Sequence, residues 1–135
     1  MDHQFHADTL VDNVFLFENP DEMDCVVWQY AVGHSEMGIQ IFDNNKGLTY
    51  FLDLIMVHYF SGPLKWKSAN FQLHPWRESL PLMQELGQIP TIQSIPEEIR
   101  KMIVGTHFKL YTISATQPKV QITILSAGGH LREVK

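Results

Sequence analysis

Apolar and polar residues alternate over much of the chain, and this alternation predicts β-strands. Cys25–Val32 is rich in β-branched and aromatic residues, and Gly38–Phe42, after the turn signal Gly33–Glu36, alternates like a half-buried strand. Asp43–Gly47 then offers residues that tolerate a positive φ, so it predicts a hairpin turn into the apolar run Leu48–Phe60. We therefore expect an antiparallel meander at the centre of the fold.

The apolar run Leu48–Phe60 is ambiguous in its pattern. It has thirteen residues, more than the ~5–6 of a typical strand, and Ser61–Pro63 after it would also stop a helix. Because the turn before the run is typical of a hairpin, we expect a strand through about Asp53 and a helical or irregular stretch up to Phe60. Both alternatives bury the segment.

Further alternating stretches predict more strands. They are Val11–Glu18, Leu64–His74, and the pair His107–Ser114 and Lys119–Ser126, which is typical of a hairpin. Lys65 and Lys67 favour an edge position for Leu64–His74, because charged side chains discourage pairing with other chains. After the hairpin, the glycine pair Gly128-Gly129 predicts a turn into a tail.

Two short helices are predicted between these strands. The first is opened by Ser79-Leu80-Pro81 and closed by Gly87, with Leu82, Met83 and Leu86 facing inward. The second has Ser94 as a cap, Glu97 as the other half of a capping box, and Gly105 as a left-handed stop. Its apolar stripe, which we expect to face the core, consists of Ile95, Ile99, Met102 and Ile103.

These elements indicate the α+β class and one domain. With 135 residues, 44% of them apolar, the chain is long enough to bury a sizeable core. We expect a single domain over residues 1–135: an antiparallel sheet of five to seven strands with two or three short helices on one face. Residues 1–9 include His3, His6 and Asp8, but terminal residues are commonly loose, so we expect a frayed N-terminus and not a metal site.

Charge and composition narrow the classes of partner. Fifteen acidic and ten basic residues give a net charge of -5 without a lysine or arginine cluster, which argues against nucleic acid and an anionic membrane surface. No apolar run reaches the ~20 residues of a membrane helix, and the N-terminus lacks the pattern of a secretory signal. The single Cys25 is compatible with a reducing compartment, so we expect a cytoplasmic protein. A homo-oligomer is compatible with the sequence.

Candidate chemistry is limited to histidines. The chain lacks the common nucleotide-binding, hydrolase and zinc-protease motifs, and Cys25 has no positive neighbour in the sequence to activate it. His58 stands out as the one ionisable group in the last half of the apolar run. Burying it requires a partner, which leaves two alternatives: a core histidine hydrogen-bonded to the backbone, or a ligand or catalyst. His130 follows Gly128-Gly129, whose bare backbone would let a flat ligand approach closely, unless the pair is a plain turn.

Two stretches of the chain resemble a known family. The first comprises Gly33, Ser35, Ile39-Gln40-Ile41-Phe42, Asp43-Asn44, Gly47 and Phe51, and the second is Gly128-Gly129-His130-Leu131. They are similar to a hairpin and a Gly-Gly-His-Leu element of the haem-utilisation carrier proteins of the ChuX, HutX and HemS type. In that family the Gly-Gly-His element precedes the hairpin, whereas here it follows the hairpin.

The resemblance implies a haem-binding protein. Haem would lie in an apolar pocket against the sheet, with one axial histidine or tyrosine and basic residues near the propionates. The candidates for these roles are His58, Tyr59 or His130 as the iron ligand, and Arg132 or Lys65 for the propionates.

The residues alone leave two other functions open. One is a non-catalytic protein-interaction module with structural histidines and a docking surface made of Trp66, Phe71 and Trp76. The other is a small enzyme with His58 as general base, for which the sequence offers no partner groups. We expect a binding protein rather than an enzyme.

Overall fold

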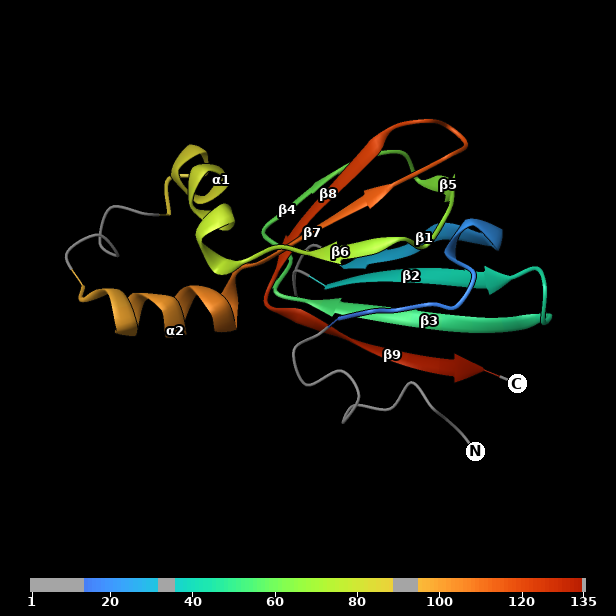
Figure 1. The fold of residues 1–135 in the computed structure, drawn as a ribbon, viewed down its shortest axis with the longest axis horizontal. Coiled ribbons are helices and arrows are strands. Elements are labelled where there is room, and N and C mark those ends of the chain that lie inside the picture. The colour runs from blue at the N-terminus through green and yellow to red at the C-terminus, as the bar shows by residue number, and fades with distance from the viewer. Residues whose placement is uncertain (1–13, 32–35, 89–94, 135) are drawn as a thin grey trace.

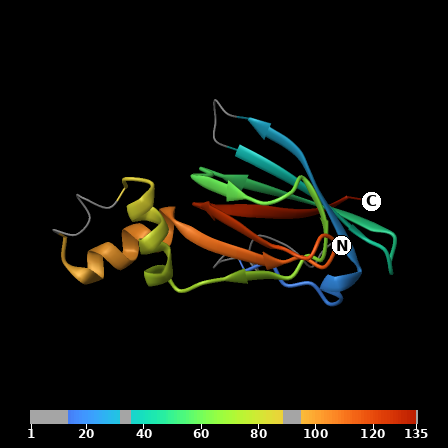
Figure 2. The same ribbon diagram turned by 90° about the horizontal axis from the view of Figure 1, so that it is seen from above.

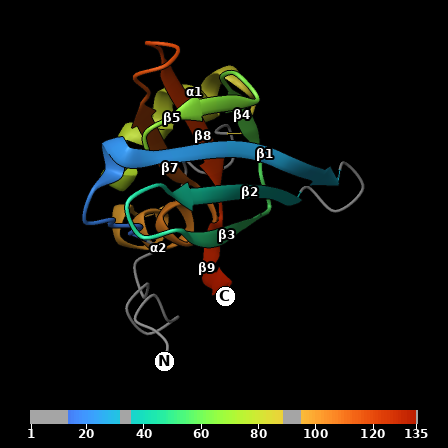
Figure 3. The ribbon, with the colours of Figure 1, turned by 90° about the vertical axis from the view of Figure 1, so that its right-hand side faces the viewer.

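The computed structural model describes residues 14–31, 36–88 and 95–134. In this part of the chain, strands form two antiparallel sheets that lie as two layers, with β8 crossing behind β1 and β2 in Figure 3. The five-stranded sheet has the order β5-β1-β2-β3-β9, with β1 Met23–Ala31, β2 Glu36–Asp43, β3 Leu48–Ile55, β5 Lys65–Lys67 and β9 Gly128–Val134. The four-stranded sheet has the order β4-β8-β7-β6, with β4 Tyr59–Ser61, β6 Phe71–Leu73, β7 Lys109–Ser114 and β8 Gln121–Ser126.

The predicted meander is confirmed as β1, β2 and β3. Ile39 of β2 pairs with Val27 on one side and Leu52 on the other, so apolar side chains of the three strands line one face. The turn between β2 and β3 contains Gly47 at φ 67°, the conformation that favours glycine. β3 ends at Ile55, two residues later than expected.

A corner joins the two sheets, because two strands bend from one layer into the other. β3 leads into β4 and β8 into β9 within a few residues. The backbone N–H of Ala127 donates to Ile55 O (3.1 Å), and the N–H of His58 donates to Leu125 O (2.7 Å), so hydrogen bonding continues around the bend. In the described parts of the chain, nine strands in two layers therefore replace the single sheet of five to seven strands that we expected.

The backbone conformation at the corner explains why the residues after Gly128 form a strand. Gly128 takes φ 147° and begins β9, which pairs with β3, so the expected tail after the glycine pair is wrong. Met56, on the other bending strand, has φ 48°. Residues with positive φ break the regular extended path, and here they redirect the chain between layers.

The predicted edge strand Leu64–His74 is two strands in different sheets. β5 pairs with β1, whereas β6 pairs with β7. Between them Ser68 is fully buried and has φ 106°, a conformation that L-residues rarely adopt. Each of the two strands is the edge of its sheet, as the lysines indicated.

The main core lies between the two sheets. Its fully buried side chains come from both layers and include Ile39, Ile41, Leu52, Ile113, Ile122 and Ile124. Val11–Glu18 was expected to be a strand, but its described residues, 14–18, form none. Phe15 instead inserts into the core, where its ring stacks on Tyr111 (centroids 5.4 Å apart) and meets Phe71 edge-on (5.6 Å).

The helices lie at one end of the molecule (Figures 1 and 2), where they pack against outward-facing side chains of the four-stranded sheet. Met83 of α1 (Leu80–Glu85), Val104 of α2 (Glu97–His107) and Leu125 of β8 are buried together. Leu125 faces the helices because its neighbour Ile124 faces the main core. The α+β class is thus confirmed. None of the described helices has the length and apolar character that crossing a bilayer requires.

The two helices differ in how well the sequence predicted them. α1 follows a 3-10 turn, Trp76–Ser79, and ends before Gly87, whose φ is 74° as expected of a left-handed stop. α2 continues through Gly105 to His107, so the expected stop there is wrong. The predicted stripe is also wrong in part: Ile99 and Met102 are 44% and 63% exposed. α2 extends away from the sheets (Figure 1), and only Val104 near its end is buried. The proposed cap Ser94 lies outside the described residues.

Candidate functional site

His58 lies at the corner between the sheets, beside the end of α2. Its Nε2–H donates to the carbonyl of His107 (3.2 Å), and its ring stacks on Phe108 with centroids 4.5 Å apart. The adjacent Tyr59 is partly buried against the helices. Of the two alternatives for His58, this geometry is that of a histidine hydrogen-bonded to the backbone.

The environment of His58 predicts that stability depends on pH. Burial lowers the pKa of His58 below its ordinary value of 6.5; the hydrogen bond to His107 O opposes this, and the charge of His107 adds to it. The unfolded chain therefore binds more protons, so the contribution of neutral His58 is complete above about pH 6.5 and lost as pH falls through the lowered pKa. Urea unfolding between pH 7 and 5 should show this slope, and His58→Gln should flatten it. An equal slope in both proteins would contradict the expectation.

The predicted docking surface of Trp66, Phe71 and Trp76 is wrong, because these side chains face inward. Trp66 and Phe71 are 3% and 5% exposed and belong to the main core. Trp76 packs against the helices and is partly buried. Alternation in Leu64–His74 identified residues that share a strand face but not whether that face is open.

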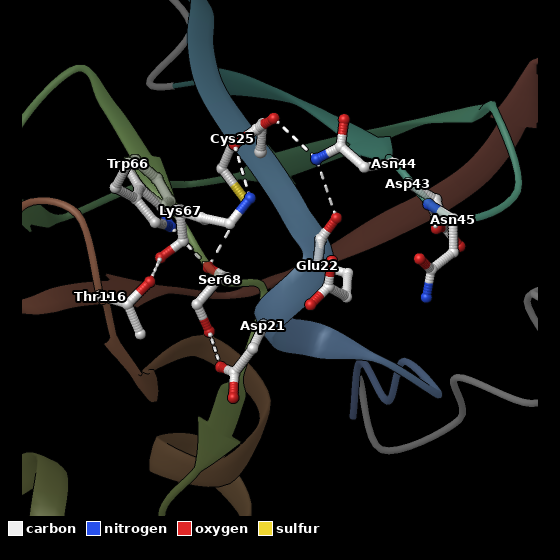
Figure 4. A network of polar contacts seen from close by, with 11 residues as sticks. Asp21, Glu22, Cys25, Asp43, Asn44, Asn45, Trp66, Lys67, Ser68 and Thr116 are labelled. Atoms are coloured by element: carbon white, nitrogen blue, oxygen red, sulfur yellow. Dashed lines mark hydrogen bonds and ion pairs between the residues drawn. The ribbon is translucent and has the colours of Figure 1, made fainter.

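A network of polar contacts connects neighbouring segments at the start of β1 (Figure 4). The carbonyl of the buried Ser68 accepts hydrogen bonds from Trp66 Nε1 (2.9 Å) and the Cys25 thiol (3.7 Å), and its hydroxyl donates to Asp21 Oδ1 (3.1 Å). Backbone hydrogen bonds of Lys67 with residues 116 and 117 also tie β5 to the β7–β8 loop. Burial, then the charge of Asp24, raises the pKa of the Cys25 thiol. We conclude that this network is structural and that Cys25 is unreactive.

His74 makes the most enzyme-like contacts of the described histidines. Its Nδ1 is 2.9 Å from Glu78 Oε1, and its Nε2 is 2.7 Å from Thr112 Oγ1. A carboxylate, an imidazole and a hydroxyl thus follow one another, as they do in enzymes that activate a hydroxyl as a nucleophile. A hollow of about 450 Å³ borders His74 but is not lined by Thr112. The contacts join the turn before α1 to β7, and we assign them a structural role.

His130 and Arg132 project from the outer face of the five-stranded sheet. The intervening Leu131 is fully buried, so the side chains on either side of it point away from the core. Arg132 Nε donates to Asp53 Oδ2 (3.3 Å) on the neighbouring strand β3. Its guanidinium also lies over the ring of Phe51, 4.8 Å from the centroid.

Trp28, which we did not single out from the sequence, completes this group. A β-bulge between Val27 and Gln29 interrupts the pairing of β1 with β2 at Trp28. Its indole is 48% exposed and meets Phe51 edge-on, with centroids 5.4 Å apart. Four side chains thus lie together on the outer face: Trp28, Phe51, Asp53 and Arg132, here called the Trp28 cluster.

Gly38 makes room for the indole of Trp28 against the sheet. A Cβ atom at this position would be only 2.6 Å from Trp28 Nε1, so any other residue would displace the indole. The sequence contained a signal for this pair: alternation from Cys25 and Val27 places Trp28 on the opposite face. A glycine within a strand marks a close approach.

A hollow of about 260 Å³, here called the Gly38 hollow, lies beside the Trp28 cluster. Its lining residues are Gln29, Glu36, Met37, Gly38, Asp53, Leu54 and Ile55. Two of them carry carboxylates, Glu36 and Asp53, and Ile55 is 48% exposed. Aromatic, cationic, anionic and apolar groups therefore meet on one open sheet surface.

The residues predicted to hold haem fall in two separate places. His58 and Tyr59 lie beside the helices, whereas His130 and Arg132 lie on the outer face of the other sheet. Hollows of about 500 and 450 Å³ are present, but none of these four residues lines them. Among the described residues, no group of three or more His, Cys, Asp or Glu side chains is arranged to hold a metal ion. In the described ranges these residues do not form the implied pocket, and haem binding stays a prediction.

No protein-family model matches this chain, and neither a curated protein nor a solved structure does. Function is therefore inferred from the outer face of the five-stranded sheet.

Proposed function

We propose that the protein is a non-catalytic protein-interaction module that binds its partner through the outer face of the five-stranded sheet. The observation that carries this proposal is the Trp28 cluster, in which a half-exposed tryptophan and an arginine contact the same phenylalanine ring. Tryptophan and arginine dominate the residues that contribute most to protein–protein binding. Of the described elements, the helices pack against the four-stranded sheet at one end of the molecule and do not cover this face (Figures 1 and 2).

The surroundings of the Trp28 cluster resemble the anatomy of an interface. Phe42 and Ile55 add apolar surface, 39% and 48% exposed, and lie on the strands β2 and β3. Lys65 and Lys67 border the face on the edge strand β5, and His130 borders it on β9. An aromatic centre with a charged rim is the usual composition of such surfaces. Since the side chains stand on paired strands, little order would be lost on binding.

Trp28→Ala is expected to weaken partner binding at least about 30-fold, because a truncated hot-spot tryptophan typically costs 2 kcal/mol or more. Met102→Ala, which removes an exposed apolar side chain of α2, is the matched control and should bind as the wild type does. Immobilised wild-type protein would first capture the partner from cell extract. Titration of the purified partner then gives the dissociation constants, and circular dichroism confirms that both variants fold. Equal affinity of Trp28→Ala and wild type would contradict the proposal.

The haem prediction has its own test, a titration with hemin. A Soret shift that saturates at one equivalent and disappears in His58→Ala or His130→Ala would support haem binding. No shift at micromolar protein would reject it, and would leave the interaction function untouched.

A further inference from the structure

We propose that the Gly38 hollow receives a lysine or arginine side chain of the partner protein. This inference rests on the interaction function proposed above and specifies the chemistry of the partner at one position. It follows from the register of three strands, the charges around the hollow and its size.

The shape of the Gly38 hollow follows from strand register. Gln29, Gly38 and Asp53 are opposite one another across β1, β2 and β3, and the row faces outward because the neighbours of Gly38, Met37 and Ile39, are buried. Gly38 contributes no side chain, and Trp28 Nε1 lies in the space over it, so the gap in the row opens beside the indole, between Glu36, Asp53 and Ile55. The gap is flanked by polar groups and meets the N–H edge of the Trp28 indole at Gly38.

The groups around the gap favour a cation. The carboxylates of Glu36 and Asp53 and the amide oxygen of Gln29 accept hydrogen bonds, and an ammonium or guanidinium group supplies only donors. Within the described ranges the Glu36 side chain forms no ion pair or hydrogen bond, so no described residue balances its charge.

Arg132 shows that this surface holds a cation in the same way. Its guanidinium lies over Phe51 while its Nε donates to Asp53, which combines an aromatic ring with a carboxylate. The Gly38 hollow offers the carboxylates of Glu36 and Asp53 on the other side of the Asp53 position in the sheet. A partner's side chain would therefore repeat the contact between Arg132 and a carboxylate of this surface.

The size of the hollow fits one long side chain. Its volume of about 260 Å³ is below the roughly 300–1,000 Å³ of small-molecule sites. Lysine and arginine bury their apolar stems while the charged head contacts polar groups, and Ile55 offers a surface for such a stem. The net charge of -5 also favours encounter with a basic partner.

An NMR titration with Nα-acetyl-lysine methylamide tests the inference, with the norleucine analogue as an uncharged probe of similar shape. The lysine compound should shift the Trp28 indole N–H and the Gly38 amide, and the norleucine compound should leave them in place. Glu36→Gln should raise the dissociation constant about two- to fivefold, the effect of an exposed ion pair. Glu98→Gln, which makes the same charge change on α2, should not alter it.

The outcomes separate this inference from the function on which it rests. Equal shifts with both compounds, no shifts, or an unchanged constant in Glu36→Gln would reject a cationic occupant. If partner binding depends on Trp28 but not on Glu36, the proposed interaction function is supported. Only the inference that a basic side chain enters the Gly38 hollow is then rejected. Binding that depends on neither would reject both. Self-association through this face, measured by sedimentation and weakened by Glu36→Gln, would replace a separate partner with a second copy of the chain.

Discussion

Phe15→Ala is expected to lower the free energy of unfolding by about 3–5 kcal/mol, the range for a large aromatic side chain removed from a core. Phe15 is 1% exposed and packs against Tyr111 and Phe71 of the four-stranded sheet. Its segment belongs to no strand, so side-chain burial is the main interaction that holds it there. Alanine would leave a cavity between the sheets. Urea unfolding followed by tryptophan fluorescence measures the loss.

The neighbouring residue provides the control for this prediction. Leu16 is 69% exposed, so Leu16→Ala should change the free energy of unfolding by less than about 0.5 kcal/mol. The two variants remove side chains one residue apart in the same segment. A loss below about 1 kcal/mol in Phe15→Ala would mean that residues 14–18 do not seal the core.

Lys109→Met is expected to cost about 2–3 kcal/mol of stability, because the charge-assisted hydrogen bonds of a partly buried ammonium group would be lost. Lys109 Nζ donates to Gly105 O (2.7 Å) and Ala127 O (3.2 Å), and lies 3.5 Å from Thr106 O. It thus satisfies carbonyls at the end of α2, where a positive charge also complements the helix dipole. The same ammonium ties the helix to the turn between β8 and β9.

Thermal unfolding and hydrogen exchange together test the role of Lys109. Lys109→Met should lower the melting temperature and weaken protection of the last turn of α2 more than that of β2. Lys101→Met removes an exposed lysine from the same helix and is the control. Identical protection of α2 in both variants would show that Lys109 does not hold the helix end.

The candidate site illustrates why residue patterns identified some positions and missed others. Arg132 and His130 were singled out for a haem pocket, and both lie on an exposed face beside Asp53. Trp28 was passed over, although alternation placed it opposite the buried Cys25. Its importance depends on Phe51 and Gly38, which come from different strands, and single-strand periodicity contains no information on such neighbours.

The docking surface was misplaced for a related reason. Trp66 and Phe71 alternate with polar residues, a pattern that marks a half-buried strand without stating which side of the domain it covers. In the fold the chain passes between the layers at Ser68, so both aromatic residues enter the core. Ile99 and Met102 of α2 show the converse, since an apolar helical stripe remains exposed where no sheet lies beneath it.

Local signals were sufficient to predict the α+β class, the β1–β3 meander and the C-terminal hairpin. These depend on alternation and turn residues within short stretches, where two-residue periodicity and the positive φ of glycine act directly. Tertiary structure alone decided that β3 and β8 bend into a second layer, and that Asp53 meets Arg132 from 79 residues away. Such pairings depend on how whole strands bury their apolar faces against one another, because no local preference distinguishes one layer from the other.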